Sequence, residues 1–441
     1  YINMSNTITK FLPKITKVEQ TNGELRFVLS GDDKYGLDKS IVNGIRRVLL
    51  TDIPTVGFNL TESGVNNDIN VVTNNSALHN EMMTHRVALI PLYLNPENYM
   101  RRHLFECKVV HDSDDPFRFV TMNDVSIYPL KSGIQERLDK YFDVSYDFPH
   151  EDSAVLIEQL STVTIDNYDM NKPLSQKEKD KIYRPFSFRK EIHYSMLTEL
   201  KSTNTEDSFQ ELNFYGSPSV GYGHQDAKYQ GVSQATYSFE IDDKLVKSVL
   251  KEKLKVEEIE KKNEKTYTRK FMLGESERYF HRDNDGEANR YNFAVKSIHY
   301  YDSETIFKKA IEILIGQVLS LKTEFIELLK ENDSRVSVEQ VKDNIYHYEI
   351  DNESHTLGNI IQSHVVRRVI DKNSLVNLCG YKKPHPLEDR ILIIVSLNPD
   401  HKAAKHDELS KMQSTTTLLV ESLESIINDL RALDKVTEKT F

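Results

Sequence analysis

The feature that most constrains the fold is a strand followed by a long amphipathic helix, a pattern that occurs twice. Residues 291–299 resemble a strand and lead into a helix predicted over 303–330, and a second strand at 391–397 precedes a helix at about 415–433. In each helix, apolar residues recur three and four positions apart. They are Leu314, Val318, Leu321, Phe325 and Leu328 in the first helix, and Leu423, Ile427 and Leu430 in the second. Each apolar stripe requires another helix to cover it.

Each long helix is preceded by a strand and a shorter helix. Residues 15–30 read as two strands around the turn signal Asn22-Gly23, and a helix begins after a capping residue, Asp38, and ends near Asp52. Its apolar stripe leaves Arg47 roughly on the opposite face and Arg46 on the flank. The second occurrence has a strand at 345–350 and a helix over 356–370.

These parallels predict a degenerate internal duplication. Two short phrases mark it, Ile45-Arg46-Arg47-Val48 and Val366-Arg367-Arg368-Val369. Each copy has more apolar surface than a small unit can cover, so packing one copy against the other is the economical solution. The sequence therefore predicts an α+β fold with an intramolecular pseudo-dimer, whose interface is the pair of apolar helix stripes.

The segment between the two halves of the first copy reads as an inserted, mainly β domain. Runs at 117–120 and 155–157 look like strands, and charged stretches at 174–184 and 247–270 look like solvated excursions. The expected domains are the first part of module 1 (1–98), the insert (99–289), the second part of module 1 (290–331) and module 2 (332–441).

Composition narrows the class of function. The 441 residues carry a formal charge of −11, which opposes nucleic-acid binding by the chain as a whole and favours protein partners. No stretch approaches the roughly 18 apolar residues of a membrane span. Cys107 and Cys379 are the only cysteines, which excludes a thiolate zinc cluster and a disulfide framework.

Three local patterns suggest a catalytic or ligand-binding site, but none of them matches the motif that such a site requires. His79, Glu81 and His85 lack metalloprotease spacing. The Gly221-Tyr222-Gly223 loop lacks the third glycine and the lysine of phosphate-binding loops, so a tight turn is favoured. His385, between two prolines, has no partner in any recognisable nucleophile motif.

Longer phrases carry a family resemblance. IVNGIRRVLLTDIPTV (41–56) and NSALHNEMMTHRVALIPL (75–92) resemble the alpha-type subunit of RNA polymerases, above all the third-largest subunit of eukaryotic and archaeal enzymes. GYGHQDAKYQGVS (221–233) is similar to a phrase of that family's inserted domain. SHTLGNII (354–361) and GYKKPHPLE (380–388) resemble the small eleventh subunit of RNA polymerase II.

The resemblance implies contact surfaces for other polymerase subunits. The interface residues it implies are Asn43, Arg46, Arg47, Glu81, His85, Arg86, His224, Asp226, Lys228, Thr356, Leu357, Asn359, Tyr381 and His385. No catalytic residue is implied in this chain. The family's insert often holds a cysteine-bound metal, and because only Cys107 occurs here we expect no metal or cofactor, with magnesium held by the catalytic subunit of the complex.

The resemblance further implies a non-catalytic scaffold of a DNA-directed RNA polymerase. Its expected partners are the two largest subunits and a small subunit of the tenth or twelfth type, with DNA and RNA reached only through the complex, no membrane and no homo-oligomer. Fused alpha-like modules are typical of large nucleocytoplasmic DNA viruses, which implies the host cytoplasm (the viral factory) or the virion, or the nucleus if the source is cellular.

Two alternative functions remain open at this point. One is a free-standing interaction or nucleic-acid-binding factor with an alpha-type fold. The other is a hydrolase that uses the region of His79 and His85.

Overall fold

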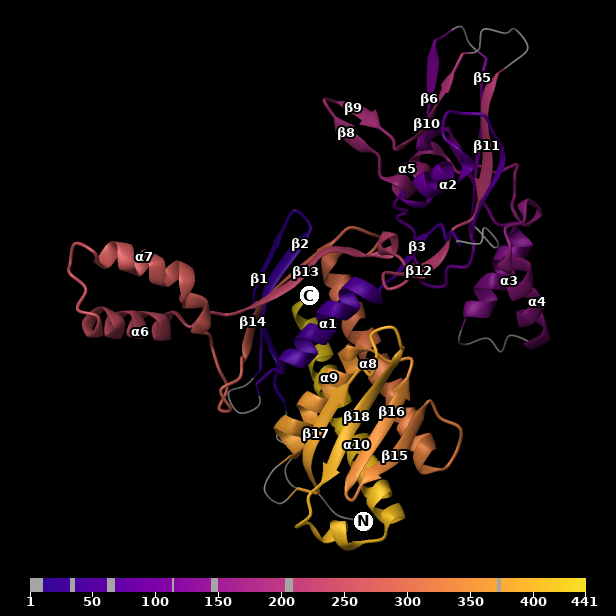
Figure 1. Cartoon of the computed structure of the whole chain (residues 1–441). Helices are drawn as coiled ribbons and strands as arrows, with labels where there is room; N and C mark the ends of the chain where they lie inside the picture. The colour runs from indigo at the N-terminus through magenta and orange to yellow at the C-terminus, as the bar shows by residue number, and fades with distance from the viewer. Residues whose placement is uncertain are drawn as a thin grey trace. The chain divides into compact units, whose positions relative to one another are not determined.

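The computed structural model describes residues 11–31, 36–61, 68–112, 115–143, 150–202, 209–370 and 374–441. The chain forms two compact units. The module unit comprises residues 1–52, 232–297 and 302–441, and the insert unit comprises residues 53–231 and 298–301. Figure 1 labels their helices and strands, and we describe each unit separately. No helix in the described ranges combines the length and the apolar character that a membrane crossing requires.

Module 1 begins with the predicted hairpin. β1 (Lys14–Thr21) pairs with β2 (Glu24–Ser30), and both turn residues, Asn22 and Gly23, have positive φ. Asn-Gly tolerates this conformation at low cost, which explains why the turn lies there. The helix α1 (Lys39–Thr51) follows, capped as predicted by the Asp38 side chain, which accepts a hydrogen bond from the backbone N–H of Ser40.

Two later strands complete the module 1 sheet. β13 (Val232–Phe239) pairs with β14 (Arg290–Ser297), which pairs with β2, so the antiparallel order is β1-β2-β14-β13. The long helix α8 (Ser303–Leu329) follows. Between β13 and β14 the chain forms α6 (Asp243–Val256) and α7 (Glu264–Gly274), a pair of helices that Figure 1 shows projecting from the end of this sheet.

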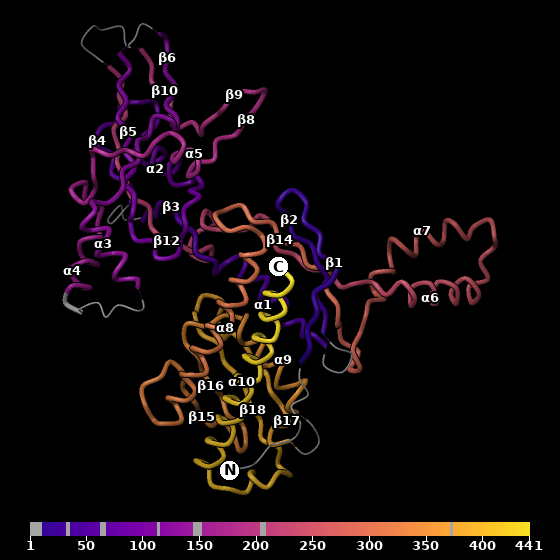
Figure 2. The backbone as a smooth tube through the Cα atoms, turned by 180° about the vertical axis from the view of Figure 1, so that it is seen from behind, coloured from indigo at the N-terminus to yellow at the C-terminus, as the bar shows by residue number. Residues whose placement is uncertain are grey.

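Module 2 repeats the plan of module 1. Its elements are β15 (Val336–Lys342), β16 (Ile345–Asp351), α9 (His355–His364), β17 (Val376–Lys382), β18 (Arg390–Leu397) and α10 (Glu408–Thr440). The sheet order, β15-β16-β18-β17, is the order of module 1 with each strand replaced by its counterpart. The predicted duplication is therefore present in the topology, and Figure 2 shows α8 and α10 on the same face of the unit.

The two arginine phrases do not mark equivalent positions, contrary to the sequence interpretation. Counted from the capping residues Asp38 and Ser354, the asparagines Asn43 and Asn359 are both five positions on, but Arg46 is eight positions on and Arg367 is thirteen. Arg367 follows the end of α9, in a single π-helical turn (Val365–Val369).

The insert unit is built around a four-stranded antiparallel sheet of order β4-β11-β5-β7. Its strands are β4 (Ile69–Asn74), β11 (Gln210–Gly216), β5 (His103–His111) and β7 (Val125–Pro129). Smaller pairs are β3 (Pro54–Gly57) with β12 (Ser219–Tyr222), β6 (Phe117–Thr121) with β10 (Met196–Lys201), and β8 (Phe186–Phe188) with β9 (Glu191–His193). The helices are α2 (Asn80–Ala88), α3 (Ser132–Phe142), α4 (His150–Ser161) and α5 (Gln176–Tyr183).

Several sequence predictions for the insert differ from the structure. Residues 155–157 lie in α4 and not in a strand, the charged stretch at 174–184 contains α5, and the stretch at 247–270 forms most of α6 and α7. The chain passes between the two units after Asp52 and after Gly231, whereas the sequence placed the limits of the insert after residues 98 and 289. The first limit differs because β3, just after Asp52, pairs with β12 of the insert. The second differs because β13 pairs with β14 across about fifty residues. No local pattern reveals either contact.

Candidate subunit interface

The two modules meet where α1 crosses α9. A Cβ atom placed on Gly44 would lie 2.9 Å from Cδ1 of Ile360, so the two helices approach closely at this point. Gly44 and Ile360 are each six positions beyond the cap of their helix. The crossing therefore lies at equivalent positions of the two copies, as expected for a local twofold axis between them.

Hydrogen bonds flank the crossing on both sides. The guanidinium Nε of Arg47 donates to Oγ1 of Thr356 at 2.8 Å, and the hydroxyl of Ser363 donates to the Asp38 carboxylate at 2.6 Å. Arg47 and Thr356 were both expected to contact other subunits, and the structure places them against each other. Arg46 donates to the side chain of Asn43, 3.0 Å away on the same helix, and both are half-buried.

α8 packs against α10, and we call their interface the α8–α10 seam. The residues of the predicted helix stripes lie on these two helices. All of the predicted residues are buried except Leu328, which is half-buried. An ion pair between Lys322 and Glu424 joins the two helices at the edge of the seam. An apolar seam with a charged rim is the arrangement that helix pairing favours.

The long helices also pack reciprocally on the opposite sheets. Phe325 of α8 lies 5.8 Å, ring to ring, from Tyr348 of β16 in module 2. Phe441, directly after α10, lies 5.3 Å from Phe27 of β2 in module 1. Burial raises the pKa of Tyr348 to about 12, and its hydroxyl bonds the hydroxyl of Thr415 at 2.6 Å. Because each module supplies part of the other's core, neither sheet is fully covered without its counterpart.

The module 2 phrases have mainly packing roles. A Cβ atom on Gly358 would lie 2.7 Å from the ring of Tyr381, so a glycine allows β17 to approach α9. Leu357 is buried and Asn359 is half-buried. His385 is exposed, and its Nδ1 accepts a hydrogen bond of 3.2 Å from the backbone N–H of Leu387, which fits the expected turn.

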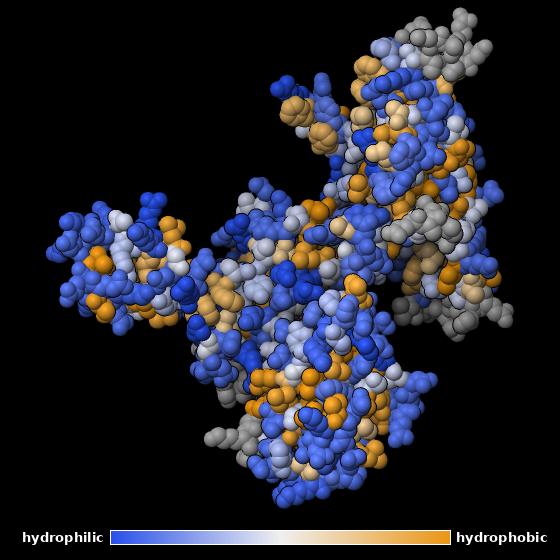
Figure 3. Space-filling view, in the orientation of Figure 1, coloured by the Kyte–Doolittle hydropathy of each residue, from blue (hydrophilic) through white to orange (hydrophobic). Residues whose placement is uncertain are grey.

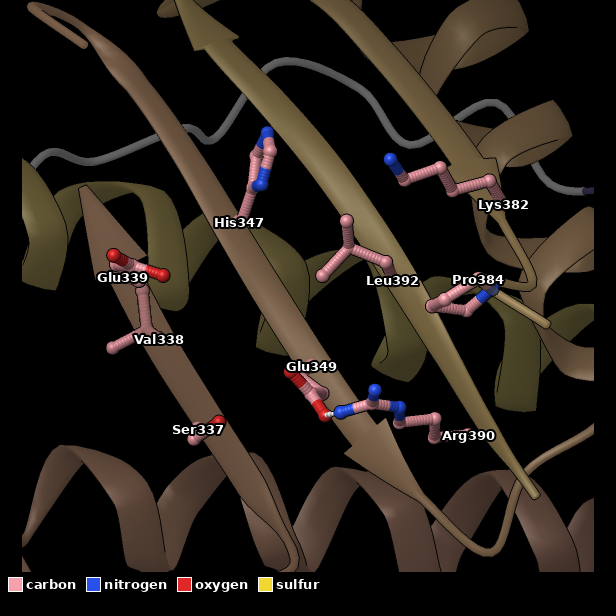
Figure 4. Close-up of a pocket in the computed structure, with 9 residues that line it drawn as sticks. All are labelled: Ser337, Val338, Glu339, His347, Glu349, Lys382, Pro384, Arg390 and Leu392. Atoms are coloured by element: carbon pink, nitrogen blue, oxygen red, sulfur yellow. Dashed lines mark hydrogen bonds and ion pairs between the residues drawn. The ribbon is translucent and has the colours of Figure 1, made fainter. Parts of the chain in front are cut away.

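A cavity of about 280 Å³ lies on the face of the module 2 sheet opposite to the helices. Ser337, Val338, Glu339, His347, Glu349, Lys382, Pro384, Arg390 and Leu392 line it. Figure 4 shows Arg390 pointing at Glu349, and it also bonds Glu388 at 2.6 Å. These partners neutralise the guanidinium group, and the cavity lining brings no nucleophile together with a general base.

In the insert unit, α2 presents charged side chains outward. Glu81, His85 and Arg86 are exposed on it. Burial by itself raises the pKa of the Asp226 carboxyl, but the backbone hydrogen bond and the charge of Lys228, with a smaller contribution from His85, lower this pKa below its ordinary value. The Lys228 ammonium lies 3.3 Å from Asp226. We group the exposed residues of α2 with Asp226 and Lys228 as one candidate docking region and call it the α2–Asp226 surface.

The glycine-rich phrase is a packed turn, as the sequence favoured. A Cβ atom on Gly221 would lie 2.4 Å from the ring of Tyr229, so the side chain of Tyr229 requires glycine there. The backbone N–H of Gln225 donates to the carbonyl of Tyr222 at 3.0 Å and closes the turn. His224 stacks on Tyr222 with ring centres 5.5 Å apart.

The geometry gives no support to a metalloenzyme site around His79. His79 caps α2, where its Nδ1 accepts a long hydrogen bond from the backbone N–H of Met82. Within the described ranges no group of three or more His, Cys, Asp or Glu side chains is arranged to hold a metal ion. Cys107 is fully buried, and burial raises the pKa of its thiol to about 12.

Sequence reasoning missed a buried charge network in the insert unit. Asp68, 1% exposed, pairs with Arg101 at 2.6 Å and accepts hydrogen bonds from the Ser219 hydroxyl and the Asn59 backbone N–H. Arg101 also donates to the carbonyl of Ser217 at 2.7 Å. Arg101, Ser217 and Ser219 are far from Asp68 in the sequence, and no local motif predicts their contacts.

The fold and the interface together define a pseudo-symmetric pair of sheet-and-helix dimerisation modules in one chain. Two family models match it, both described as the RNA polymerase Rpb3/Rpb11 dimerisation domain, over residues 35–318 and 346–435. The chain belongs to this RNA polymerase family and carries two modules of it.

Known relatives match part of the chain. It is 35% identical over 81 residues to the DNA-directed RNA polymerase subunit Rpo3 of Pyrobaculum islandicum, a match that covers 18% of this chain and 26% of that subunit. It is 33% identical over 91 residues to the DNA-directed RNA polymerase II subunit rpb3 of Dictyostelium discoideum, a match that covers 20% of this chain and 26% of that subunit. It is 31% identical over 71 residues to the human DNA-directed RNA polymerases I and III subunit RPAC1, a match that covers 16% of this chain and 18% of that subunit. The matches thus span about a quarter of these relatives or less.

Proposed function

We propose that this chain is a non-catalytic assembly subunit of a DNA-directed RNA polymerase. The observation that carries the proposal is the reciprocal packing of two family modules, in which Phe325 and Phe441 each complete the core of the opposite sheet. Covalent linkage keeps the modules at an effective concentration on the order of millimolar, so the pair forms without a second chain. The preformed pair then offers its remaining surfaces to the two largest subunits, which hold the magnesium and the nucleotide chemistry.

The α2–Asp226 surface is our candidate for docking one large subunit. Glu81, His85, Arg86 and Asp226 are all exposed, whereas Arg47, the other strong candidate, is engaged by Thr356 within the chain. A rim of exposed charges sets partner choice and association rate more than stability. We propose that Arg86 and Glu81 supply this specificity.

The source and setting form part of the same proposal. Fusion of the two modules in one chain supports a large DNA virus as the source, with the polymerase in the host cytoplasm or in the virion. A small subunit of the tenth or twelfth type is the further expected partner, and the chain itself needs no cofactor.

Co-purification tests the proposal. A tagged chain expressed in its native setting is expected to co-elute with two very large subunits, and Arg86→Glu combined with Glu81→Lys is expected to lower their recovery while the chain stays folded. Lys247→Glu combined with Glu252→Lys is a matched control, because both side chains are exposed on α6 in the other unit and are likewise five positions apart. Elution of the wild-type chain alone, or equal recovery with the charge-reversed variant and the control, would contradict the proposal or the docking surface respectively.

A further inference from the structure

The β8–β9 hairpin exposes two phenylalanines on one face, and we call it the aromatic hairpin (residues 186–193). Phe186 and Phe188 are 61% and 58% exposed, and alternation along β8 directs both to the same side. Across the described residues this pair of strands bonds to no third strand. Figure 3 shows the hairpin's apolar residues at the surface of the insert unit. Large aromatic side chains exposed together in this way are uncommon on a protein surface and indicate an interaction site.

The turn of the aromatic hairpin has a backbone conformation that is unfavourable for the residues that occupy it. Arg189 and Lys190 occupy the two turn positions with φ of 50° and 71°. Asn-Gly meets the steric demand of such a turn cheaply, whereas long side chains in this region carry backbone strain. Strain of this kind concentrates where a side chain is needed for recognition. The turn therefore places two cations beside two exposed rings.

The aromatic rings are already ordered by their neighbours. His193, paired with Phe186 across the strands, stacks on it with ring centres 5.2 Å apart, and the Arg189 guanidinium lies 5.1 Å from the centre of the Phe188 ring. Rings held in this way lose little side-chain freedom on binding, which is the property of effective interface anchors.

A second exposed aromatic pair lies on β6, which pairs with the distant strand β10. Phe117 and Phe119 of β6 are both about half exposed, with ring centres 5.1 Å apart. Two residues separate the end of β9 from the start of their partner strand, β10. The insert unit thus displays exposed aromatic pairs on the aromatic hairpin and on β6.

The charge of the surroundings identifies the kind of partner. Residues 53–231 contain 26 Asp and Glu against 17 Lys and Arg, a formal charge of −9, so the unit as a whole repels a nucleic-acid backbone. Arg189 and Lys190 outweigh the neighbouring Glu191, so the turn keeps a net positive charge that attracts individual carboxylates within a screening length of roughly 8 Å. Exposed phenylalanines with local cations fit an apolar protein pocket rimmed by acidic side chains.

We propose that the aromatic hairpin is a docking element that inserts Phe186 and Phe188 into an apolar, carboxylate-rimmed pocket of another protein subunit of the polymerase. The inference rests on the proposed function and adds a contact to it, separate from the α2–Asp226 surface. Aromatic anchors flanked by a charged rim are the usual composition of an interface hot spot.

Site-directed crosslinking in the assembled polymerase tests the inference. With a photoreactive benzoylphenylalanine at position 188, we expect one crosslink to another protein subunit, at a peptide containing both apolar and acidic residues. With the probe moved to position 191, which pairs with Phe188 on the same face of the hairpin, Phe186→Ser with Phe188→Ser is expected to lower the yield roughly tenfold or more. Arg189→Glu with Lys190→Glu is expected to lower it as well, and Lys177→Glu with Lys181→Glu, both exposed on α5, is the matched charge control.

The outcomes separate the two proposals. A chain that enters the complex but crosslinks to no protein subunit overturns the hairpin inference and leaves the assembly function standing. A crosslink to nucleic acid or to a second copy of this chain also overturns it. A chain that never enters the complex refutes the assembly function, and the inference falls with it.

Discussion

Exchange of the two residues at the α1–α9 crossing tests the twofold packing of the modules. Ile360 contacts the position where Gly44 would carry a Cβ atom, and Leu314 and Thr356 lie 3.6 Å from the same point. Gly44→Ile alone places a branched side chain where only glycine fits. Ile360→Gly alone leaves a void at a fully buried position of α9.

The magnitudes follow from this geometry. Overpacking by Gly44→Ile costs about 1–3 kcal/mol, slightly offset by the better helix propensity of isoleucine. Ile360→Gly costs about 3–6 kcal/mol, because loss of a buried isoleucine side chain costs about 2–5 kcal/mol and glycine in a helix roughly one more. In the exchanged pair the isoleucine fills the same space from the opposite helix, so we expect a coupling of about 2–3 kcal/mol between the two changes.

Urea unfolding followed by far-ultraviolet circular dichroism measures the overall effect, because the chain lacks tryptophan. Hydrogen exchange in peptides from α1 and α9 locates it in the module unit. The exchanged pair should be more stable than Ile360→Gly alone. Free energies of unfolding that simply add would refute the inference that these two residues meet at an axis between equivalent helices.

Three further predictions concern single substitutions. Arg47→Ala removes the hydrogen bond to Thr356 and should lower the stability of the module unit by about 1 kcal/mol, and an unchanged urea midpoint would contradict the assigned contact. Asp68→Asn leaves Arg101 buried without its counter-charge and should destabilise the insert unit by roughly 3 kcal/mol, seen as a lower melting temperature. Burial lowers the pKa of His364 to about 4, so the neutral form is favoured on folding, and stability should be lost as the pH falls from about 6.5 towards 4, by up to about 3 kcal/mol. His364→Gln should flatten this pH dependence of the urea midpoint, and an identical loss in the variant would assign it to other groups.

The elements that local sequence predicts well are those with a local cause. The Asn22-Gly23 turn, the Asp38 cap and the helical spacing from Leu314 to Phe325 each depend on residues a few positions apart, and each is present in the structure. The second long helix extends further than predicted, over Glu408–Thr440, because its polar ends carry no apolar period.

The elements that sequence reasoning missed depend on distant pairing. β13 belongs to the module sheet only because β14 lies beside it, and the edge strand β15 alternates too weakly to be recognised alone. The charged helices α6 and α7 looked like loops because their apolar contacts are few, with Val246 and Phe271 as the buried apolar residues of the pair.

In the candidate site, too, the sequence predicts some features and only the fold reveals the others. A family phrase identified Arg47 and Thr356 as contact residues, but only the fold reveals that they contact each other. The exposed residues of α2 remain candidates for an external partner, and the aromatic hairpin carries no phrase that the resemblance covers.

The number of copies of this chain in the assembled polymerase tests the central claim most directly. Because both modules of the pair lie in one polypeptide, native mass spectrometry of the purified complex should find one copy for each pair of large subunits. Two copies per complex would mean that the pair forms between chains and would contradict the intramolecular pseudo-dimer as the unit of assembly.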